Sequence, residues 1–385
     1  MPGLPWESIN SSTFASGTDQ EVDSGSWLSR RAHAGSHVAS TVIYSHLRFL
    51  TIGNLHKIPS QDVNYLEFQG CLHVPARPML DDFVEQYYLH IHPLIPLIDE
   101  GEFWDMYSQT ERGVASNDTM SLLLFQTMLF SSCTFVPYET IKKLGYSSLK
   151  TARAAFYRRA KLLYDMDTES SLLPLAQSAL LLIAWVPPCN STHIPYRMWL
   201  GRAIQHAKSL NADRLDTVPA LSDTATKKHH RALRRLWWCC VSLDRISPLC
   251  TRFNPYITRE SCRFEANKSL IISDLEGEVY RSNVYNPTSK KRLVGLFKVY
   301  IDLTIVLTDL LTLVYPFEDL LWSRHWPTQE EDAKIQQCEA AMKGWFVRAS
   351  TKFPAVKEAR QTTLNKRHDL HKSVMLHINL MYIYY

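Results

Sequence analysis

Apolar residues recur at three- and four-residue steps along most of this chain, the spacing that places them on one face of a helix. In "RPMLDDFVEQYYLHIHP" (77–93) this spacing predicts a helix that ends at Pro93, and Asp99 is expected to cap the next helix. The same pattern predicts further helices over 117–133, 148–167, 171–187, 196–214, 227–247, 291–316, 329–349 and about 365–385.

Between these segments the pattern is interrupted but does not change to that of a sheet. Pro248 is expected to stop the helix over 227–247, and residues 250–290 have no regular period. The segment 117–133 is apolar almost all round, so it should be central. Because no segment shows convincing strand alternation, the sequence predicts an all-α fold, a large multi-helix domain.

The two ends of the chain depart from this pattern. Residues 1–58 are of low complexity, rich in Ser, Gly, Thr and His, and are expected to be disordered or a linker before a helical domain over 59–385. The final "HKSVMLHINLMYIYY" (371–385) is strongly apolar and has no polar tail. Such a helix is normally buried by later structure, so we expect the domain to be truncated at its C-terminus.

Composition excludes little. With 42 basic and 38 acidic residues the net charge is +4, which does not by itself indicate nucleic-acid binding. The basic runs "KKHHRALRR" (227–235) and "SKKRL" (289–293) are expected to be solvated helix faces. There is no secretory signal and no apolar run long enough to span a bilayer, so a soluble intracellular protein without membrane contact is expected.

The densest stretch is "RRLWWCCVSLDR" (234–245), which could be a site or a piece of scaffold. Cys239 and Cys240 point about 100° apart on a helix and cannot face one zinc ion together. The chain has eight cysteines and no Cys-x-x-Cys pair, which favours reduced thiols and no metal. A wide apolar stripe favours a buried scaffold helix, made by Leu233, Leu236, Trp237, Cys240, Leu243 and Ile246.

This stretch resembles the signature of the fungal-specific transcription factor domain, the middle homology region of fungal zinc-cluster transcription factors. The matching signature positions are Arg234, Arg235, Trp237, Trp238, Asp244 and Arg245. Other segments agree in the same order, including a His-Pro turn at His92, Pro93, Pro96 and Asp99. The similarity is best over 62–265 and is nearest in character to cutinase-gene activators. It implies a helical regulatory domain rather than an enzyme, with these residues in structural roles and no cofactor.

Two departures from the family pattern bear on function. Residues 1–70 contain no cysteine, so they cannot form the family's six-cysteine DNA-binding zinc cluster, and no specific DNA contact is expected from this chain. Asn254 stands before Pro255, where the family usually has arginine. The resemblance therefore implies a nuclear, pathway-specific regulator, with secondary metabolism as the first pathway type to consider. It would act through other transcription factors, self-association or a small-molecule effector whose binding residues are unknown.

Two alternatives remain open. "DDFVE" (81–85) matches the aspartate-rich motif with which all-α isoprenoid synthases hold Mg²⁺ and diphosphate. However, Phe125 stands where the companion motif needs a carboxylate, and Asp81 and Asp82 equally suit the N-terminus of a helix. The histidines of "HIH" (90–92) and "HH" (229–230) are expected at the surface or in turns. The second alternative is a non-functional remnant of a regulator.

Overall fold

Helices make up most of the computed structural model, which describes residues 40–112, 118–187, 195–217, 223–251, 253–259, 271–315, 329–354, 377–378 and 381. All of these residues belong to a unit that begins at Ser40. The all-α prediction is confirmed. The helices are α1 (Ser60–Phe68), α2 (Met79–Gln86), α3 (Glu100–Arg112), α4 (Leu122–Ser132), α5 (Tyr138–Lys143), α6 (Leu149–Asp165), α7 (Leu172–Leu182), α8 (Pro195–Ser209), α9 (Thr224–Thr251), α11 (Pro287–Val314) and α12 (Gln329–Lys352).

Short strands and turns complete the described chain. Strand β1 (Thr41–Ile43) pairs antiparallel with β3 (His73–Pro75), and β2 (Leu50–Thr51) pairs parallel with β4 (Met120–Ser121). Short 3-10 helices connect the longer elements: η2 (Tyr44–His46), η3 (Leu55–Lys57), η5 (Cys133–Phe135) and η6 (Ala212–Thr217).

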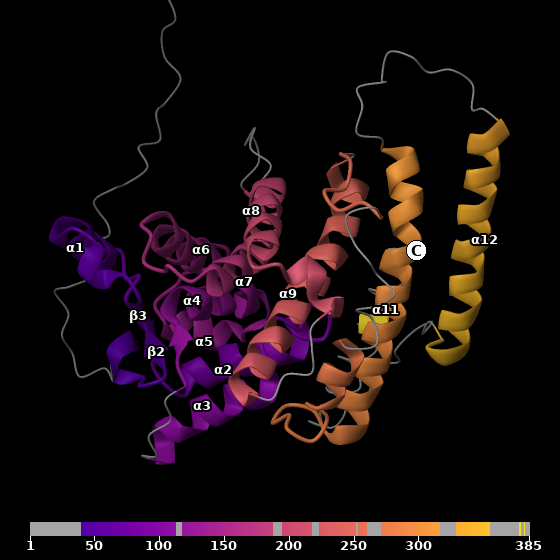
Figure 1. Ribbon diagram of the computed structural model, residues 1–385. Helices are drawn as coiled ribbons and strands as arrows, with labels where there is room; N and C mark the ends of the chain where they lie inside the picture. The colour runs from indigo at the N-terminus through magenta and orange to yellow at the C-terminus, as the bar shows by residue number, and fades with distance from the viewer. Residues whose placement is uncertain are drawn as a thin grey trace, which may run out of the picture. The chain divides into compact units, whose positions relative to one another are not determined.

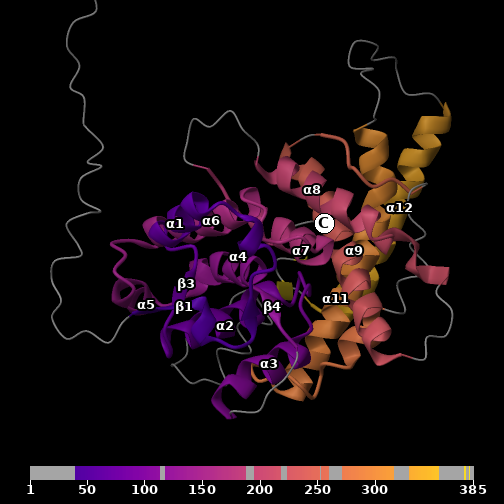
Figure 2. The ribbon, with the colours of Figure 1, turned by 60° about the vertical axis from the view of Figure 1, so that its left-hand side comes forward.

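Helix α4 lies at the centre, as its apolar sequence predicts: every one of its side chains is buried. It packs against α6 and α7; from there α7 contacts α8, α8 contacts α9, α9 contacts α11, and α11 contacts α12. Figures 1 and 2 show this succession, with α12 beyond α11 in both views. The described helices do not include one that is both long and apolar enough to cross a bilayer.

The folded unit starts earlier than the sequence suggested. Residues 40–58, expected to be weakly ordered, carry β1, β2 and two single-turn helices. Leu47, Phe49 and Leu50 are buried, and the Phe49 ring packs edge-on against Phe125 of α4 with centroids 5.5 Å apart. The segment lacks a repeating period because its contacts come from irregular backbone. Residues 1–39 lie outside the described residues.

Pro248 does not stop α9, which continues to Thr251. A proline inside a helix removes one backbone hydrogen bond, and tertiary contacts can offset that loss. Here Ser247 and Pro248 are buried, and Asp244 and Arg245, one turn earlier, are held by side-chain contacts described below. A prediction from helix propensity alone therefore ended this helix before its observed last residue.

Helix α2 ends in a wider turn. Residues Tyr87–Ile91 form a π-helix, η4, in which the His92 backbone N–H donates to the Tyr87 carbonyl at 3.0 Å. This five-residue spacing inserts one extra residue into the helix. Of the helix predicted over about 365–385, only residues 377, 378 and 381 are described; they are helical and buried, and the rest lies outside the described residues.

Candidate functional site

The signature residues of α9 lie inside the protein. Trp237 and Trp238 are each 1% exposed, and Arg235 is equally buried. Arg234 is slightly more accessible and makes a two-pronged pair with Asp274, Nε to Oδ2 at 2.8 Å and Nη2 to Oδ1 at 3.0 Å. The side chains that stood out in the sequence are thus enclosed by neighbouring segments.

Arg235 lies in a buried polar cluster, which we define as His92, Asp99, Glu100, Arg235, Glu278 and Lys290. Its Nη1 is 2.7 Å from Glu278 Oε1, and its Nη2 is 3.2 Å from Asp99 Oδ2. Nη1 also donates to the Pro96 carbonyl at 3.4 Å, and Nη2 donates to that of Asp274 at 3.3 Å. One guanidinium therefore connects α9 to the turn before α3 and to the segment before α11.

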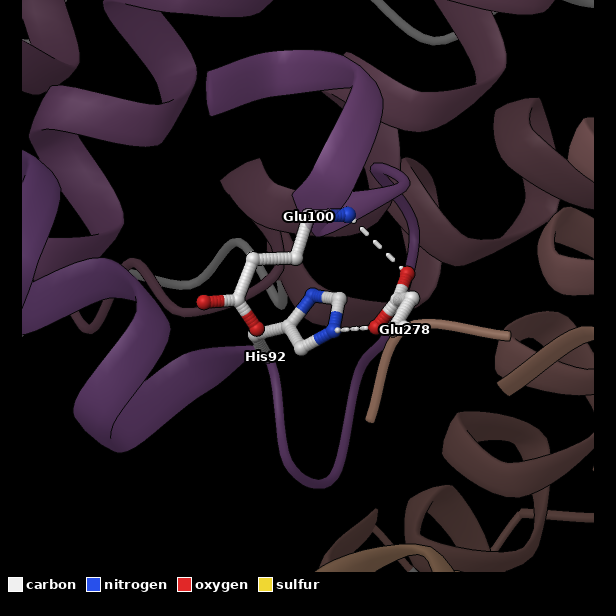
Figure 3. A group of neighbouring side chains, drawn as sticks. All are labelled: His92, Glu100 and Glu278. Carbon is white, nitrogen blue, oxygen red and sulfur yellow. Dashed lines mark hydrogen bonds and ion pairs between the residues drawn. The ribbon is translucent and has the colours of Figure 1, made fainter. Parts of the chain in front are cut away.

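Lys290, near the start of α11, supplies the second positive charge of this cluster. Its ammonium group is hydrogen-bonded to the Glu100 carboxylate and lies 3.0 Å from Glu278 Oε2. Glu278 also accepts a hydrogen bond of 2.9 Å from the Glu100 backbone N–H. Figure 3 shows Glu278 reaching both that nitrogen and the His92 ring. Glu278 is therefore the shared acceptor of the cluster.

Ion pairing keeps Glu278 charged in this buried cluster. Burial alone would raise the pKa of Glu278, yet Arg235, followed by His92 and Lys290, holds that pKa well below its ordinary value. Burial, and then Lys290, lower the pKa of His92, so its ring is neutral at pH 7. His92 Nε2 lies 3.0 Å from Glu278 Oε2, and because Glu278 is ionised, this nitrogen must carry the proton and donate.

The cluster brings together one imidazole and two carboxylates, the usual ligands of a transition metal. Donor atoms of His92, Glu100 and Glu278 lie within 4.8 Å of one another. However, the Lys290 ammonium already bonds to both carboxylates, and the near nitrogen of His92 donates to Glu278. The residues present therefore fit internal ion pairing better than a metal centre. With every member but Asp99 buried, they also offer a substrate no direct access.

A second buried pair follows on α9. Asp244 and Arg245 contact each other, Oδ2 to Nη1 at 2.7 Å, and both are fully buried. Asp244 accepts the backbone N–H groups of Tyr256 and Ile257 at 2.9 and 2.8 Å. Arg245 donates to the Ile257 carbonyl at 2.7 Å and to Thr308 of α11 at 2.9 Å. The pair thus clamps the segment 253–259 between α9 and α11.

The remaining sequence-selected residues have structural surroundings. Pro93 is buried directly after His92, and Asp99 Oδ1 accepts the Glu102 backbone N–H at 3.0 Å, as expected of an N-cap. The backbone carbonyl of Asn254 accepts a hydrogen bond from Arg197 Nη1 at 2.9 Å. Cys239 and Cys240 are buried, and burial raises the pKa of both thiols, so they are protonated.

The aspartate pair of the isoprenoid-synthase alternative is divided between two partners. Asp81 Oδ1 accepts the Tyr107 hydroxyl from α3, and Asp82 Oδ2 accepts the Thr140 hydroxyl from α5. Both aspartates lie in the first turn of α2, where negative charge stabilises the helix N-terminus. Phe125 is fully buried in α4. These contacts favour a role in helix capping and packing.

One expectation about polar residues was wrong, because Lys290, from a run expected to be solvated, is only 4% exposed. His92 lies in a turn, as expected, but it is also buried in the cluster. Sequence reasoning missed Glu278 and Asp274 altogether, because they lie in the region without a period. The one available signal was charge balance: a buried Arg235 requires an acidic partner from elsewhere in the chain.

One open groove lies along α8 in the described structure. Gly201 and Tyr256 are neighbours in it, and a methyl group on Gly201 would lie 3.6 Å from the Tyr256 hydroxyl, an ordinary contact distance. Its lining comprises Gly201, Ile204, Gln205, Lys208, Ser209 and Tyr256. Lys208 is the sole charged member, so the groove has no convergent catalytic set.

The described polar side chains thus form buried ion pairs that hold a helical domain together. Comparison with known families identifies it further. The model of the fungal specific transcription factor domain matches residues 84–347, a span that contains all six cluster residues and both α9 pairs. The chain belongs to this family.

Curated relatives are transcription regulators by name. The chain is 32% identical over 193 residues to cutinase transcription factor 1 beta of Fusarium vanettenii, covering 50% of this chain and 21% of that protein. Over 241 residues it is 23% identical to a fusaric acid cluster transcription factor of Fusarium oxysporum f. sp. lycopersici, 61% and 33% of the two chains. Over 175 residues it is 30% identical to the acetamidase regulatory protein of Aspergillus fumigatus, 45% and 21%.

The chain therefore spans a fifth to a third of the length of these relatives. No solved structure matches it.

Proposed function

We propose that this chain is the regulatory module of a nuclear transcription regulator and acts through protein partners or an effector. The observation that carries the proposal is the family match over 84–347, which lies within the folded unit and contains its buried clusters. The relatives' names mention cutinase, a fusaric acid cluster and acetamidase, each a specific metabolic target. By analogy, this chain regulates one pathway, with secondary metabolism the first to test.

The polar chemistry of the described residues supports a scaffold for regulation. In the buried cluster, Arg235 and Lys290 pair with carboxylates from other segments, and the Asp244–Arg245 pair fixes a loop. Both arrangements hold helices in one relation to each other. A domain of this kind transmits binding at its surface by favouring one arrangement of its helices.

A tethering assay tests the proposal. The chain is fused to a heterologous DNA-binding domain whose site stands upstream of a reporter gene in a filamentous fungus. The fusion is expected to change reporter expression several-fold relative to the DNA-binding domain alone. Arg235→Ala, which breaks the buried cluster, should abolish the effect, whereas Arg231→Ala, at a half-buried position one turn earlier on α9, should retain it. A folded, nuclear fusion that leaves the reporter at baseline under inducing and repressing conditions contradicts the proposal.

The route to DNA is a separate question. Because residues 1–70 have no cysteine, we propose that this stretch reaches DNA through partners. Electrophoretic mobility shifts with the purified chain and a chelator should show no sequence-specific complex. A specific complex under those conditions would overturn this part of the proposal and leave the tethering result intact.

A further inference from the structure

The outermost long helix, α12, carries a second row of apolar side chains beside the one that anchors it. The anchoring row is Cys338, Trp345 and Ala349, and the Trp345 indole donates to the Val299 carbonyl of α11 at 2.9 Å. Three residues before each of these stand Ile335, Met342 and Phe346, about 60° around the helix. Ile335 is 43% exposed and Phe346 is 38% exposed. This row packs only in part against its own unit.

The charges of α12 are divided along its length. Its first half (329–340) holds four acidic residues, Glu330, Glu331, Asp332 and Glu339, against one basic residue, Lys334. Its second half (341–352) holds Lys343, Arg348 and Lys352 and no acidic residue. An α12 helix is therefore complementary in charge to another α12 that runs in the opposite direction.

We propose that two copies of this chain associate through α12, packed antiparallel about a two-fold axis. Ile335 comes six residues after the first residue of α12, and Phe346 comes six residues before the last. Aligning the two helices end to end thus places Ile335 of each copy opposite Phe346 of the other. The same register brings Glu339 close to Lys343 of the second copy. Because the contact is two-fold symmetric, each favourable pair forms twice.

The expected complex is weak. One helix of 24 residues is about 36 Å long, and a single helix pair buries less surface than a standard protein interface. Association should therefore depend on concentration, and it should weaken with added salt because exposed charges are screened.

The same charge distribution has an effect within a single helix, and the experiment must separate the two. Acidic first turns and basic last turns stabilise an isolated helix through its dipole. Glu339 and Lys343 also form an ion pair of 2.6 Å within α12. Reversing the charge of either residue removes this ion pair within the helix, whether or not two copies associate. A contact between copies, however, can be restored by mixing the two variants, because each charge then meets an opposite charge on the other molecule.

The test is sedimentation velocity of the whole chain at rising concentration in low salt. Glu339→Lys and Lys343→Glu, each alone, should raise the dissociation constant about tenfold or more, since each places like charges at two contacts. An equimolar mixture of the two variants should recover association near the wild-type level, because opposite charges then meet at both contacts. Thermal melts verify that each variant is folded.

An apolar pair of variants completes the design. Phe346→Ser should weaken association about tenfold, whereas Val347→Ser, at a 63% exposed position outside the row, should leave it unchanged. A wild-type chain that stays monomeric over the whole range overturns the proposal. So does a mixture no stronger than its two components, or a Phe346→Ser variant equal to Val347→Ser. None of these outcomes bears on the reporter assay, which reads regulation and not self-association.

Discussion

At the scale of residues, the charges that most affect the stability of the fold are the buried ones. Arg235 and Glu278 are each 1% exposed, so the attraction between them is little screened, and each would be costly to bury alone. The exposed pairs, such as Arg259 with Asp309, are energetically minor by comparison. The exposure of a charged pair, and not the number of charges in it, therefore determines how much stability a substitution is expected to cost.

Arg235→Ala should lower the free energy of unfolding by about 3–5 kcal/mol, because it leaves Glu278 and Asp99 without their main counter-charge. Guanidinium denaturation monitored by tryptophan fluorescence measures the loss. The matched control is Arg231→Ala, one turn earlier on α9 and 39% exposed in its pair with Glu102, which should cost less than about 1 kcal/mol. Equal losses at the two positions would show that the buried cluster carries no special weight.

His90 gives the fold a dependence on pH. Burial, and then the nearby His377, lower its pKa from 6.5 to about 4. Between these two values the unfolded chain binds a proton that the folded chain does not, so the free energy of unfolding falls as the pH falls. The slope from His90 is at most about 1.4 kcal/mol per pH unit. His92, also with a lowered pKa, acts in the same direction.

His90→Gln should therefore flatten the decline in stability between about pH 6.5 and pH 5. Urea denaturation at several pH values gives the slope. His46→Gln, at an exposed position, is the control and should leave the slope unchanged. A His90→Gln variant with the wild-type slope would mean that His90 is protonated to the same extent in the folded and the unfolded chain over this pH range.

At the scale of elements, α9 organises its neighbours from two points on its length. Arg235 holds the segments before α3 and α11, and Asp244 with Arg245 holds the segment 253–259. That segment forms no helix or strand of its own, so its position depends on these side chains.

Asp244→Ala should release the segment 253–259. The Tyr256 and Ile257 amides would lose their acceptor, and Arg245 would lose its buried counter-charge, at a cost of about 3–5 kcal/mol. Hydrogen exchange should show faster exchange at those two amides. Asp309→Ala breaks the exposed contact that holds the same segment through Arg259, so it is the matched control and should change exchange little. Equal acceleration in both variants would place the anchoring at the surface.

At the scale of the whole molecule, the N-terminal boundary of the fold can be tested directly. A chain that begins at Ser40 keeps every described contact, so its thermal midpoint should match that of the full chain. A chain that begins at residue 59 loses the buried side chains of Leu47, Phe49 and Leu50, each worth about 1.5–3 kcal/mol. We expect it to be strongly destabilised or unfolded. If the chain that begins at residue 59 has the same thermal midpoint as the full chain, the boundary lies where the sequence suggested.

Sequence reasoning recovered what depends on local period and missed what depends on distant partners. The spacing of Tyr157, Ala160 and Leu163 was enough to place α6, and uniform apolarity was enough to centre α4. Phe49 gave no such signal, because its contacts with Phe103 and Phe125 cross more than fifty residues of chain. Lys290 sits in a run that looks solvated, and only its pairing with Glu100 and Glu278 shows otherwise.

The extra residue in η4 has a consequence for the direction in which His92 points. In a regular α-helix each residue advances the side chain by about 100°, so one added residue rotates the side chains that follow it around the helix axis. The wide turn at Tyr87–Ile91 sets the phase with which the chain enters the His-Pro turn. Deleting a single residue there would leave the composition of the helix almost unchanged, yet it would turn the imidazole away from Glu278. The cluster thus depends on a count of residues as much as on their identity.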